Sequence, residues 1–283
     1  TNPFLLSNFA ALQSSNPLLY QQLSTLGFFT SPTIRKQQLL RPYPHMNGLT
    51  QNRAPVGEVR TDALEVLLER RFSRGFHLSV NYVRMHDRDA TFFLNEFDPT
   101  TTWRESNNAR PQRLAGTGIL ELPFGKGRAL ARTGVWSALF GGFQIAATYE
   151  LQPGALIDWG NVFYYGKLDD INNGVRILDR WFNTDGFERT AARGPAAYHR
   201  RVFPTRIGGL RADGLNRWDT NIQRQFRLRE GVLLELRLDV LDLFNRSSFA
   251  APVTDPFSTN FGRVVGHTAN TNRFLQIQGR IRF

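Results

Sequence analysis

Residues that could act as catalysts or metal ligands occur in this sequence, but their spacing matches no known site. The five histidines, at positions 45, 77, 86, 199 and 267, are far apart, and the chain has no cysteine to complete a metal site. The glycine-rich GKGR at 125–128 lacks the P-loop pattern. Neither a G-x-S-x-G nor an H-E-x-x-H motif is present. We therefore expect no enzymatic activity, no bound metal and no cofactor.

Two longer segments carry side chains suited to binding. The segment HDRDATFFLNEFD at 86–98 has four carboxylates that could bind a cation, although their spacing is not that of an EF-hand. The segment WGNVFYYGKLDD at 159–170 has aromatic rings that could stack on a sugar or another flat ligand. A hydrated loop is the favoured interpretation of the first segment, and packing within the loop is slightly favoured for the second.

The most distinctive polar residues alternate with apolar ones in the last quarter of the chain. This polar row, a candidate for contact with a ligand, comprises Gln223, Gln225, Glu235, Arg237, Asp239, Gln278 and Arg280. Opposite charges on neighbouring strands stabilise a sheet by about 0.2–1 kcal/mol per pair, and this structural role is the default interpretation. Contact with a passing solute, or with a plug inside a barrel, is the alternative.

Net charge and hydropathy narrow the class of protein. The formal charge is +11 and the pI is about 10.7, with almost all positive charge on arginine. A basic chain can bind nucleic acid or an anionic surface. The arginines are scattered rather than gathered in one stripe, so no nucleic-acid partner is predicted. No run of 18 apolar residues occurs, which argues against a transmembrane helix.

Alternation of apolar and polar residues predicts about seven β-strands from residue 58 onward. This two-residue period places every second side chain on the same face of a strand. The predicted strands are 58–72, 76–83, 112–122, 142–152, 216–228, 232–245 and 273–283. The first two strands, and later the fifth and sixth, are joined by three residues ending in glycine, which is a common hairpin connection.

Both hairpins can be given a register that places their apolar side chains on one face. Pairing Phe72 with Phe76, and Leu228 with Val232, fixes these registers. The other expected pairs are Leu68–Val80, Glu69–Ser79, Phe226–Leu234, Ile222–Leu238, Gln225–Glu235, Gln223–Arg237 and Asn221–Asp239.

The predicted connections differ in length between the two ends of the sheet. One end has the two tight turns and the link 123–141, whereas the other has long connections at 87–109, 153–213 and 246–270. Connections of that length are unusual in a compact domain and are normally functional. Residues 1–56 show no sustained period, apart from a short helix expected at 15–27 with Ser15 as its cap and Gly27 as its stop.

Either a soluble β-sandwich or an outer-membrane barrel would produce such alternation. In a sandwich the apolar face is a core, whereas in a barrel it meets lipid and the polar face lines the lumen. Short turns at one end, long loops at the other and aromatic residues near both ends of the apolar face favour the barrel. The expected aromatic girdles are Phe72, Phe76, Phe143, Phe226 and Phe283 at the short-turn end, and Tyr82, Tyr149 and Trp218 at the long-loop end.

Two arginines interrupt the predicted lipid face. Arg70 and Arg224 have the parity of the apolar residues, and an arginine in mid-bilayer costs about 2–4 kcal/mol. Both are within a few residues of the short-turn end, where a long side chain can reach the interface.

Several stretches resemble one family of outer-membrane proteins. They are QLLRPYPHMNG (38–48), LELPFGKGR (120–128), RWFNTDGFER (180–189), FPTRIGGLRADGLNRWD (203–219), DVLDLFNRSSFAAPVTDPFSTNFGRV (239–264) and RFLQIQGRIRF (273–283). Together they resemble the C-terminal part of TonB-dependent outer-membrane receptors of the Oar-like type. The resemblance covers most of residues 35–283, in the expected order.

This resemblance implies a barrel of about 22 strands with a plugged lumen and import of a ligand driven through TonB, contacted by an N-terminal part outside this sequence. The terminal Phe283 resembles the aromatic assembly signal read by the barrel-assembly machinery. About seven strands cannot close such a barrel, so the expected fold is an antiparallel transmembrane β-barrel fragment with long loops at one end.

The sequence thus predicts an extracellular loop region at 1–56 and the C-terminal strands of an outer-membrane barrel at 57–283. The expected function is part of a TonB-dependent receptor that takes up an unidentified ligand across the bacterial outer membrane, with membrane lipid as a partner. The alternative is a soluble, secreted β-rich module that binds carbohydrate or protein. Neither the substrate nor the oligomeric state follows from the residues.

Overall fold

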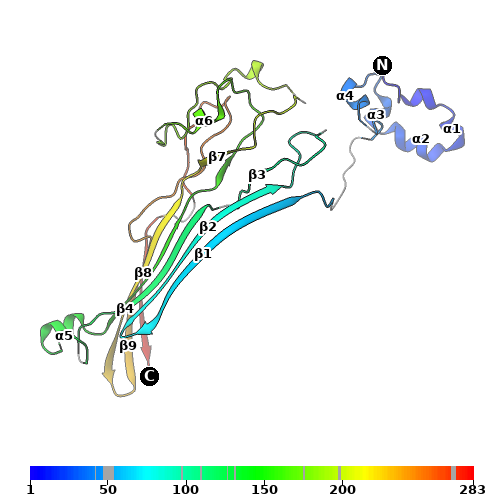
Figure 1. The fold of residues 1–283 in the computed structure, drawn as a ribbon. Coiled ribbons are helices and arrows are strands. Elements are labelled where there is room, and N and C mark those ends of the chain that lie inside the picture. The colour runs from blue at the N-terminus through cyan, green and yellow to red at the C-terminus, as the bar shows by residue number, and fades with distance from the viewer. Residues whose placement is uncertain are drawn as a thin grey trace. The chain divides into compact units, whose positions relative to one another are not determined.

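The computed structural model divides the chain into two compact units, Thr1–Pro55 and Val56–Phe283. It describes residues 1–41, 43–46, 54–96, 98–108, 110–125, 127–130, 132–174, 176–196, 199–268 and 272–283. The helices and strands are labelled in Figure 1. Within the described residues, no helix has the length and apolar character needed to cross a membrane.

The first unit consists of short helices. They are η1 (Leu6–Phe9), α1 (Leu12–Ser15), α2 (Pro17–Ser24), α3 (Gly27–Thr30) and α4 (Lys36–Leu39). The helix expected at 15–27 is shorter, because Asn16 is its N-cap, accepting a hydrogen bond from the backbone N–H of Leu19 at 3.1 Å. Gly27 begins the next helix instead of ending this one. The four-residue helices were not predicted because one turn is too short to show a period.

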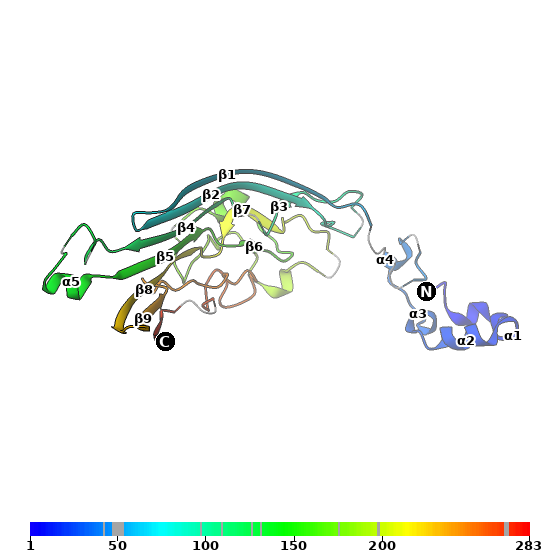
Figure 2. The ribbon, with the colours of Figure 1, turned by 90° about the horizontal axis from the view of Figure 1, so that it is seen from below.

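The second unit is dominated by an antiparallel sheet, which confirms the predicted all-β fold. Its strands are β1 (Glu58–Ser73), β2 (Phe76–Ala90), β3 (Arg104–Glu105), β4 (Gln112–Glu121), β5 (Phe143–Gln152), β8 (Leu215–Arg229), β9 (Val232–Leu241) and β10 (Phe274–Arg282). They lie in the order β1-β2-β4-β5-β8-β9-β10, with β3 paired to β2. All seven predicted strands are present, and the curved sheet does not close on itself (Figures 1 and 2).

The hairpin registers are as predicted along the strands and differ next to the turns. Every interior pair named above is observed, from Leu68–Val80 to Asn221–Asp239. In the first hairpin, however, Ser73 rather than Phe72 lies opposite Phe76, and the register shifts between residues 70 and 73. The turn therefore has two residues, Arg74 and Gly75, with φ of 54° and 80°. Positive φ at both positions is typical of a tight hairpin turn.

The pairing next to the turn of the second hairpin also differs from the prediction. Arg229 rather than Leu228 lies opposite Val232, and a register shift between Arg227 and Arg229 absorbs the extra residue. Gly231 has a φ of 77°, a conformation that glycine adopts without steric cost. Alternation alone does not reveal such a bulge, because one inserted residue next to a turn leaves the rest of the pattern intact.

The connections are more ordered than the sequence indicated. β2 continues to Ala90, so the connection expected at 87–109 starts later and contains β3. Residues 153–213 contain β6 (Leu156–Asp158), α6 (Leu168–Ile171), η2 (Ala191–Arg193) and β7 (Arg206–Arg211), and β6 pairs with β7 as a second, two-stranded sheet. The link 123–141, for which no helix was predicted, contains α5 (Val135–Phe140).

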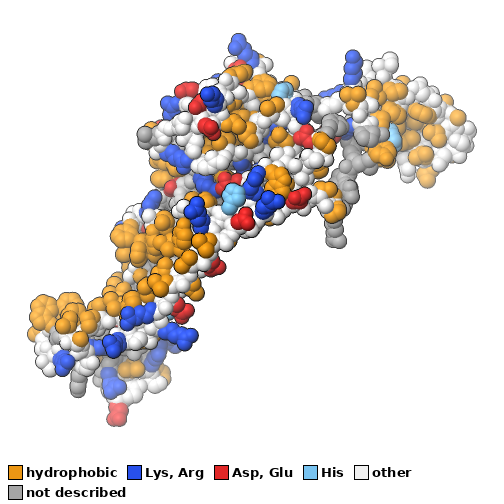
Figure 3. Space-filling model, in the orientation of Figure 1, with side chains coloured by type: hydrophobic (Ala, Val, Ile, Leu, Met, Phe, Trp, Pro, Cys, Tyr) orange, Lys and Arg blue, Asp and Glu red, His pale blue; other side chains and the backbone are white. Residues whose placement is uncertain are grey.

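The apolar face of the main sheet is open rather than covered. Val66, Leu236 and Ile277 are 51%, 42% and 82% exposed, and Figure 3 shows hydrophobic side chains gathered along the strands. Near the long-loop end, Tyr149 and Trp218 face each other in register and stack with ring centroids 4.4 Å apart. A sandwich would bury this face under a second sheet, whereas a lipid-facing surface leaves it exposed.

The two arginines on this face lie over aromatic rings at the short-turn end. The guanidinium carbon of Arg70 is 5.2 Å from the ring centroid of Phe76. That of Arg224 is 5.0 Å from the centroid of Phe143 and 4.5 Å from that of Phe226. Cation–π attraction of this kind offsets part of the cost of a charge next to lipid.

The buried hydrophobic core lies in the long connections, which we call the loop cap (residues 153–213 and 246–268). Its members are Ile157, Trp159, Val162, Ile171, Trp181, Phe182, Phe187, Phe203, Ile207, Leu210 and Phe261. The ring of Trp159 has four phenylalanine rings within 4.9–6.4 Å. Packing is therefore the role of Trp159 and Val162, although Tyr165 in the same segment is 72% exposed.

Arg201 fastens parts of the loop cap to one another. Its guanidinium donates to the backbone carbonyls of Phe203 and Trp159 at 2.7 Å and of Pro204 at 3.0 Å. Its backbone N–H donates to the side chain of Asn95, which belongs to the connection after β2, at 2.6 Å. Burial lowers the pKa of the Arg201 guanidinium from its ordinary value.

We expect Arg201→Ala to destabilise the loop cap by about 1–3 kcal/mol, because buried carbonyls lose their donor. Limited proteolysis of intact cells should show faster cleavage within 153–213. Arg200→Ala is the matched control, because the Arg200 side chain is 83% exposed and lies 3.8 Å from Asp98. Equal cleavage of the two variants would contradict the assigned role of Arg201.

Candidate functional site on the polar face of the sheet

The predicted polar row lies on the face of β8, β9 and β10 opposite the apolar residues, and its members form two connected clusters. In the first cluster, Asp239 accepts hydrogen bonds from Arg237, with N···O distances of 2.7–3.0 Å, and from Asn221 at 2.7 Å. Asn221 is the register partner of Asp239 on the neighbouring strand. The Asp239 carboxylate therefore accepts hydrogen bonds from a guanidinium on its own strand and from an amide on the neighbouring strand.

The second cluster surrounds Glu235. Its carboxylate accepts a hydrogen bond from Gln225 on β8 at 3.3 Å and forms an ion pair with Arg282 on β10 at 2.9 Å. Arg280 is the register partner of Glu235. The paired carboxylate thus links three adjacent strands, as expected of a structural cross-strand network.

Gln223 and Gln278 complete the row in different ways. Gln223 donates a hydrogen bond to the side chain of Gln144 on β5, which extends the row to a fourth strand. Gln278 lies opposite Arg237 in the register of β9 and β10. The structure therefore places all seven predicted residues on one face and brings four of them, those around Asp239 and Glu235, into contact within the row.

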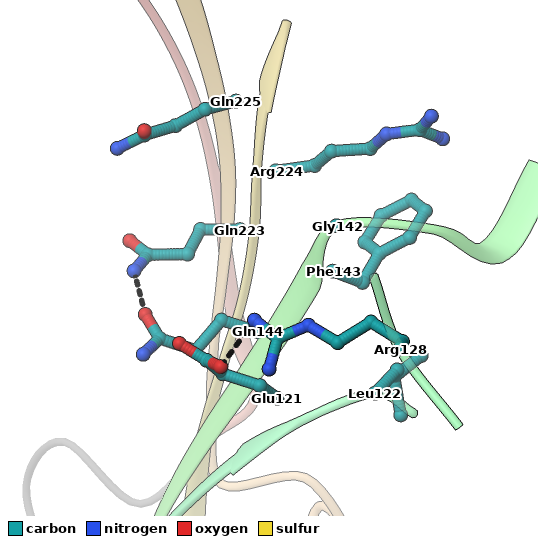
Figure 4. Close-up of a pocket in the computed structure, with 9 residues that line it drawn as sticks. All are labelled: Glu121, Leu122, Arg128, Gly142, Phe143, Gln144, Gln223, Arg224 and Gln225. Atoms are coloured by element: carbon teal, nitrogen blue, oxygen red, sulfur yellow. Dashed lines mark hydrogen bonds and ion pairs between the residues drawn. The ribbon is translucent and has the colours of Figure 1, made fainter. Parts of the chain in front are cut away.

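A polar cavity of about 180 Å³ lies at the short-turn end of the row. Its lining, drawn in Figure 4, consists of Glu121, Leu122, Arg128, Gly142, Phe143, Gln144, Gln223, Arg224 and Gln225. In this view Gln223 and Gln225 point to one side of β8, whereas Arg224 and the Phe143 ring point to the other. Arg128 and Glu121 form an ion pair at 2.5 Å.

A second hollow, which the sequence reasoning missed, lies on the polar face over β2, β4, β5 and β8. Its volume is about 300 Å³, and its lining is Ser79, Asn81, Ala115, Gly116, Thr117, Thr148, Tyr149, Glu150, Arg217 and Asp219. Small side chains leave this space, and two ion pairs border it: Arg217–Asp219 at 2.8 Å and Arg113–Glu150 at 2.8 Å. Alternation along the predicted strands places most of these residues on the polar face and could have identified them, whereas Gly116 and Tyr149 belong to the apolar face.

Carboxylates of the acidic segment at 86–98 already have partners within the protein. Thr61 donates to the carboxylate of Asp87 at 2.8 Å, and Arg104 forms an ion pair with Asp89 at 3.0 Å. In the described part of the chain, no three histidine or acidic side chains are grouped so as to hold a metal ion. Phe97 lies outside the described residues.

Because the row is partly open to water, we expect Glu235→Gln to lower the free energy of unfolding by only about 0.2–1 kcal/mol. Glutamine keeps a group that can hydrogen-bond Gln225 and loses the attraction to Arg282. Urea titration of the protein in lipid vesicles measures this loss. A loss above about 3 kcal/mol, the range of a broken buried ion pair, would contradict a wet polar face.

Comparison with protein families supports the reading of the two faces. Residues 8–276 match the family model described as outer membrane beta barrel domain. No curated protein and no solved structure matches the chain. The match supports the outer-membrane barrel over a soluble, secreted module. In such a barrel the apolar face meets lipid and the polar face meets water. The chain therefore belongs to the outer-membrane β-barrel domain family and is located in the bacterial outer membrane.

Proposed function

We propose that the chain forms part of a TonB-dependent receptor of the Oar-like type, which takes up a ligand across the outer membrane. The loop cap carries this proposal: the long connections fold around their own aromatic core at the end of the sheet away from the tight turns. In outer-membrane barrels the longer loops are extracellular. A cap with its own core provides a stable surface on which a ligand can bind before it enters the lumen.

The polar face provides a second line of support. Below the cap, the hollow over β2, β4, β5 and β8 and the polar row present paired charges and amides to the lumen. Paired charges form a polar wall without an isolated carboxylate that would hold one cation tightly. Such a wall can contact either a plug or a moving solute. The segments quoted for the resemblance to Oar-like receptors include parts of the cap and of β8–β10.

The test is uptake by cells that carry the full protein in their outer membrane. Labelled iron–siderophore complexes, oligosaccharides and short peptides serve as the panel, with and without a protonophore. We expect one class to accumulate only when both the protein and the proton gradient are present. Accumulation that ignores the gradient would indicate an open pore, and accumulation of no class would contradict a role in uptake.

A further inference from the structure

The short helix α5 carries an apolar surface that the described chain does not cover. Its residues Val135, Trp136, Leu139 and Phe140 are 71%, 64%, 55% and 43% exposed. The rings of Trp136 and Phe140 stack with centroids 5.6 Å apart and planes 16° from parallel. Figure 3 shows hydrophobic side chains gathered where Figure 1 labels α5, at the short-turn end of the sheet. An exposed aromatic cluster of this kind marks an interaction surface.

Arg224 fixes the side of the sheet on which α5 lies. Its guanidinium donates to the backbone carbonyls of Ala138 at 2.6 Å and Leu139 at 3.0 Å. These carbonyls belong to the last turn of the helix, where intrahelical partners are missing and a cation is favoured. Arg224 points to the apolar side of β8, as Figure 4 shows. The helix is therefore attached to the side of the sheet that faces lipid.

Helix α5 ends in a tight turn at Gly141. The backbone N–H of Gly141 donates to the carbonyl of Ser137 at 3.0 Å. A Cβ atom on Gly141 would lie 2.3 Å from that same oxygen, so any other residue would displace this turn. The ring of Phe140 meets Phe124, before the helix, at 6.0 Å. These contacts fix the conformation of the segment that presents the apolar side chains of α5.

The charge of the neighbouring residues indicates what covers the apolar surface of α5. Residues 123–142 contain Lys126, Arg128 and Arg132 and no acidic residue. Arg128 is paired with Glu121, so among the described residues Arg132 and Arg224 supply the positive charge near the helix. Aromatic and apolar side chains flanked by cations are typical of helices in the headgroup region of a bilayer. Short turns of outer-membrane barrels face the periplasm, where the adjoining leaflet is phospholipid.

We propose that α5 is an interfacial anchor, whose Trp136 and Phe140 insert into the periplasmic leaflet while the neighbouring cations contact phosphate headgroups. Arg224 is the positioning residue that holds the helix at this depth. The surface belongs to the membrane-facing side of the protein, so the inference is independent of what the receptor transports.

The test is a nitroxide label at Val135→Cys in the full protein reconstituted in phospholipid vesicles. These 283 residues contain no cysteine, so labels at Ile277→Cys and Val202→Cys give lipid and water references in the same chain. We expect the Val135 label to collide with dissolved oxygen more often than the Val202 label and less often than the Ile277 label, which lies near the middle of β10. Its collisions with a water-soluble nickel chelate should be several-fold fewer than those of the Val202 label.

Other results of the labelling experiment would place water or protein, instead of lipid, next to α5. Free access of nickel to the Val135 label would place the helix in water, and protection from both oxygen and nickel would mean that protein covers it; either result overturns the proposal. Arg224→Gln should raise nickel access at Val135 several-fold, whereas Arg227→Gln, on the opposite face of β8, should leave it unchanged. Equal depth in phosphatidylcholine vesicles and in vesicles with added phosphatidylglycerol would show that net lipid charge does not hold the helix, and would overturn the role given to the neighbouring cations.

Discussion

Ile277→Arg is expected to prevent stable insertion of the barrel wall. Ile277 lies near the middle of β10, is 82% exposed, and shares its face with Leu275 and Ile281. An arginine on the lipid face near the middle of a strand costs about 2–4 kcal/mol, which is a large part of the stability of a typical protein. We therefore expect less protein in the heat-modifiable, folded form and a lower urea midpoint in vesicles.

The matched control for this variant is Gln276→Arg. Gln276 is the preceding residue of the same strand and points to the opposite face, where its register partner is Asp239. An arginine there meets water and a carboxylate, so the loss should be below about 0.5 kcal/mol, as for most surface substitutions. Similar destabilisation by both substitutions would mean that the two faces do not differ in solvent, and the assignment of lipid to the apolar face would fail.

Trp159→Ala is expected to unfold the loop cap while leaving the membrane strands in place. The Trp159 side chain is 4% exposed, and its ring contacts Phe182, Phe187, Phe203 and Phe261. Truncating a buried tryptophan costs about 3–5 kcal/mol, because the lost contacts leave a cavity. Hydrogen exchange of the protein in vesicles should show loss of amide protection in the cap and unchanged protection in the main sheet.

Val202→Ala serves as the control in the same region. Val202 is 82% exposed, so its truncation removes little buried surface and should leave protection within the cap unchanged. If Trp159→Ala also left the cap protected, the aromatic cluster would not be its core. If the strands lost protection together with the cap, the two would unfold as one cooperative unit, which is not expected when the buried core lies within the cap.

The strands were predictable because their pattern has the period of the structure. In the β8–β9 hairpin, pairs on the polar face recur every two residues along each strand. The positions of the other pairs therefore follow from one of them by counting along the strands. Phe226–Leu234 and Gln223–Arg237 follow from this counting. The same periodicity placed the polar row on one face. It could not specify which members touch, because that depends on side-chain rotamers across strands.

The loop cap and α5 could not be predicted from periodicity. Trp159, Phe203 and Phe261 are separated by tens of residues, and no repeat relates them; the chain brings them together only when β6 pairs with β7 and the connections fold. Helix α5 spans six residues, less than two turns, so it shows no amphipathic period. Both features were therefore assigned to loops.

By itself, the sequence determined the all-β fold, the seven strands and their two chemically different faces, since each depends on local alternation. It also indicated the location in the outer membrane, through the unequal connections, the aromatic residues near both ends of the apolar face and the resemblance to outer-membrane receptors. The tertiary structure alone decided that the long connections contain the hydrophobic core and that Arg224 meets the carbonyls of α5. Contacts of this kind join residues far apart along the chain, such as Arg224 and Leu139, and are set by the path of the folded backbone, which local alternation does not encode.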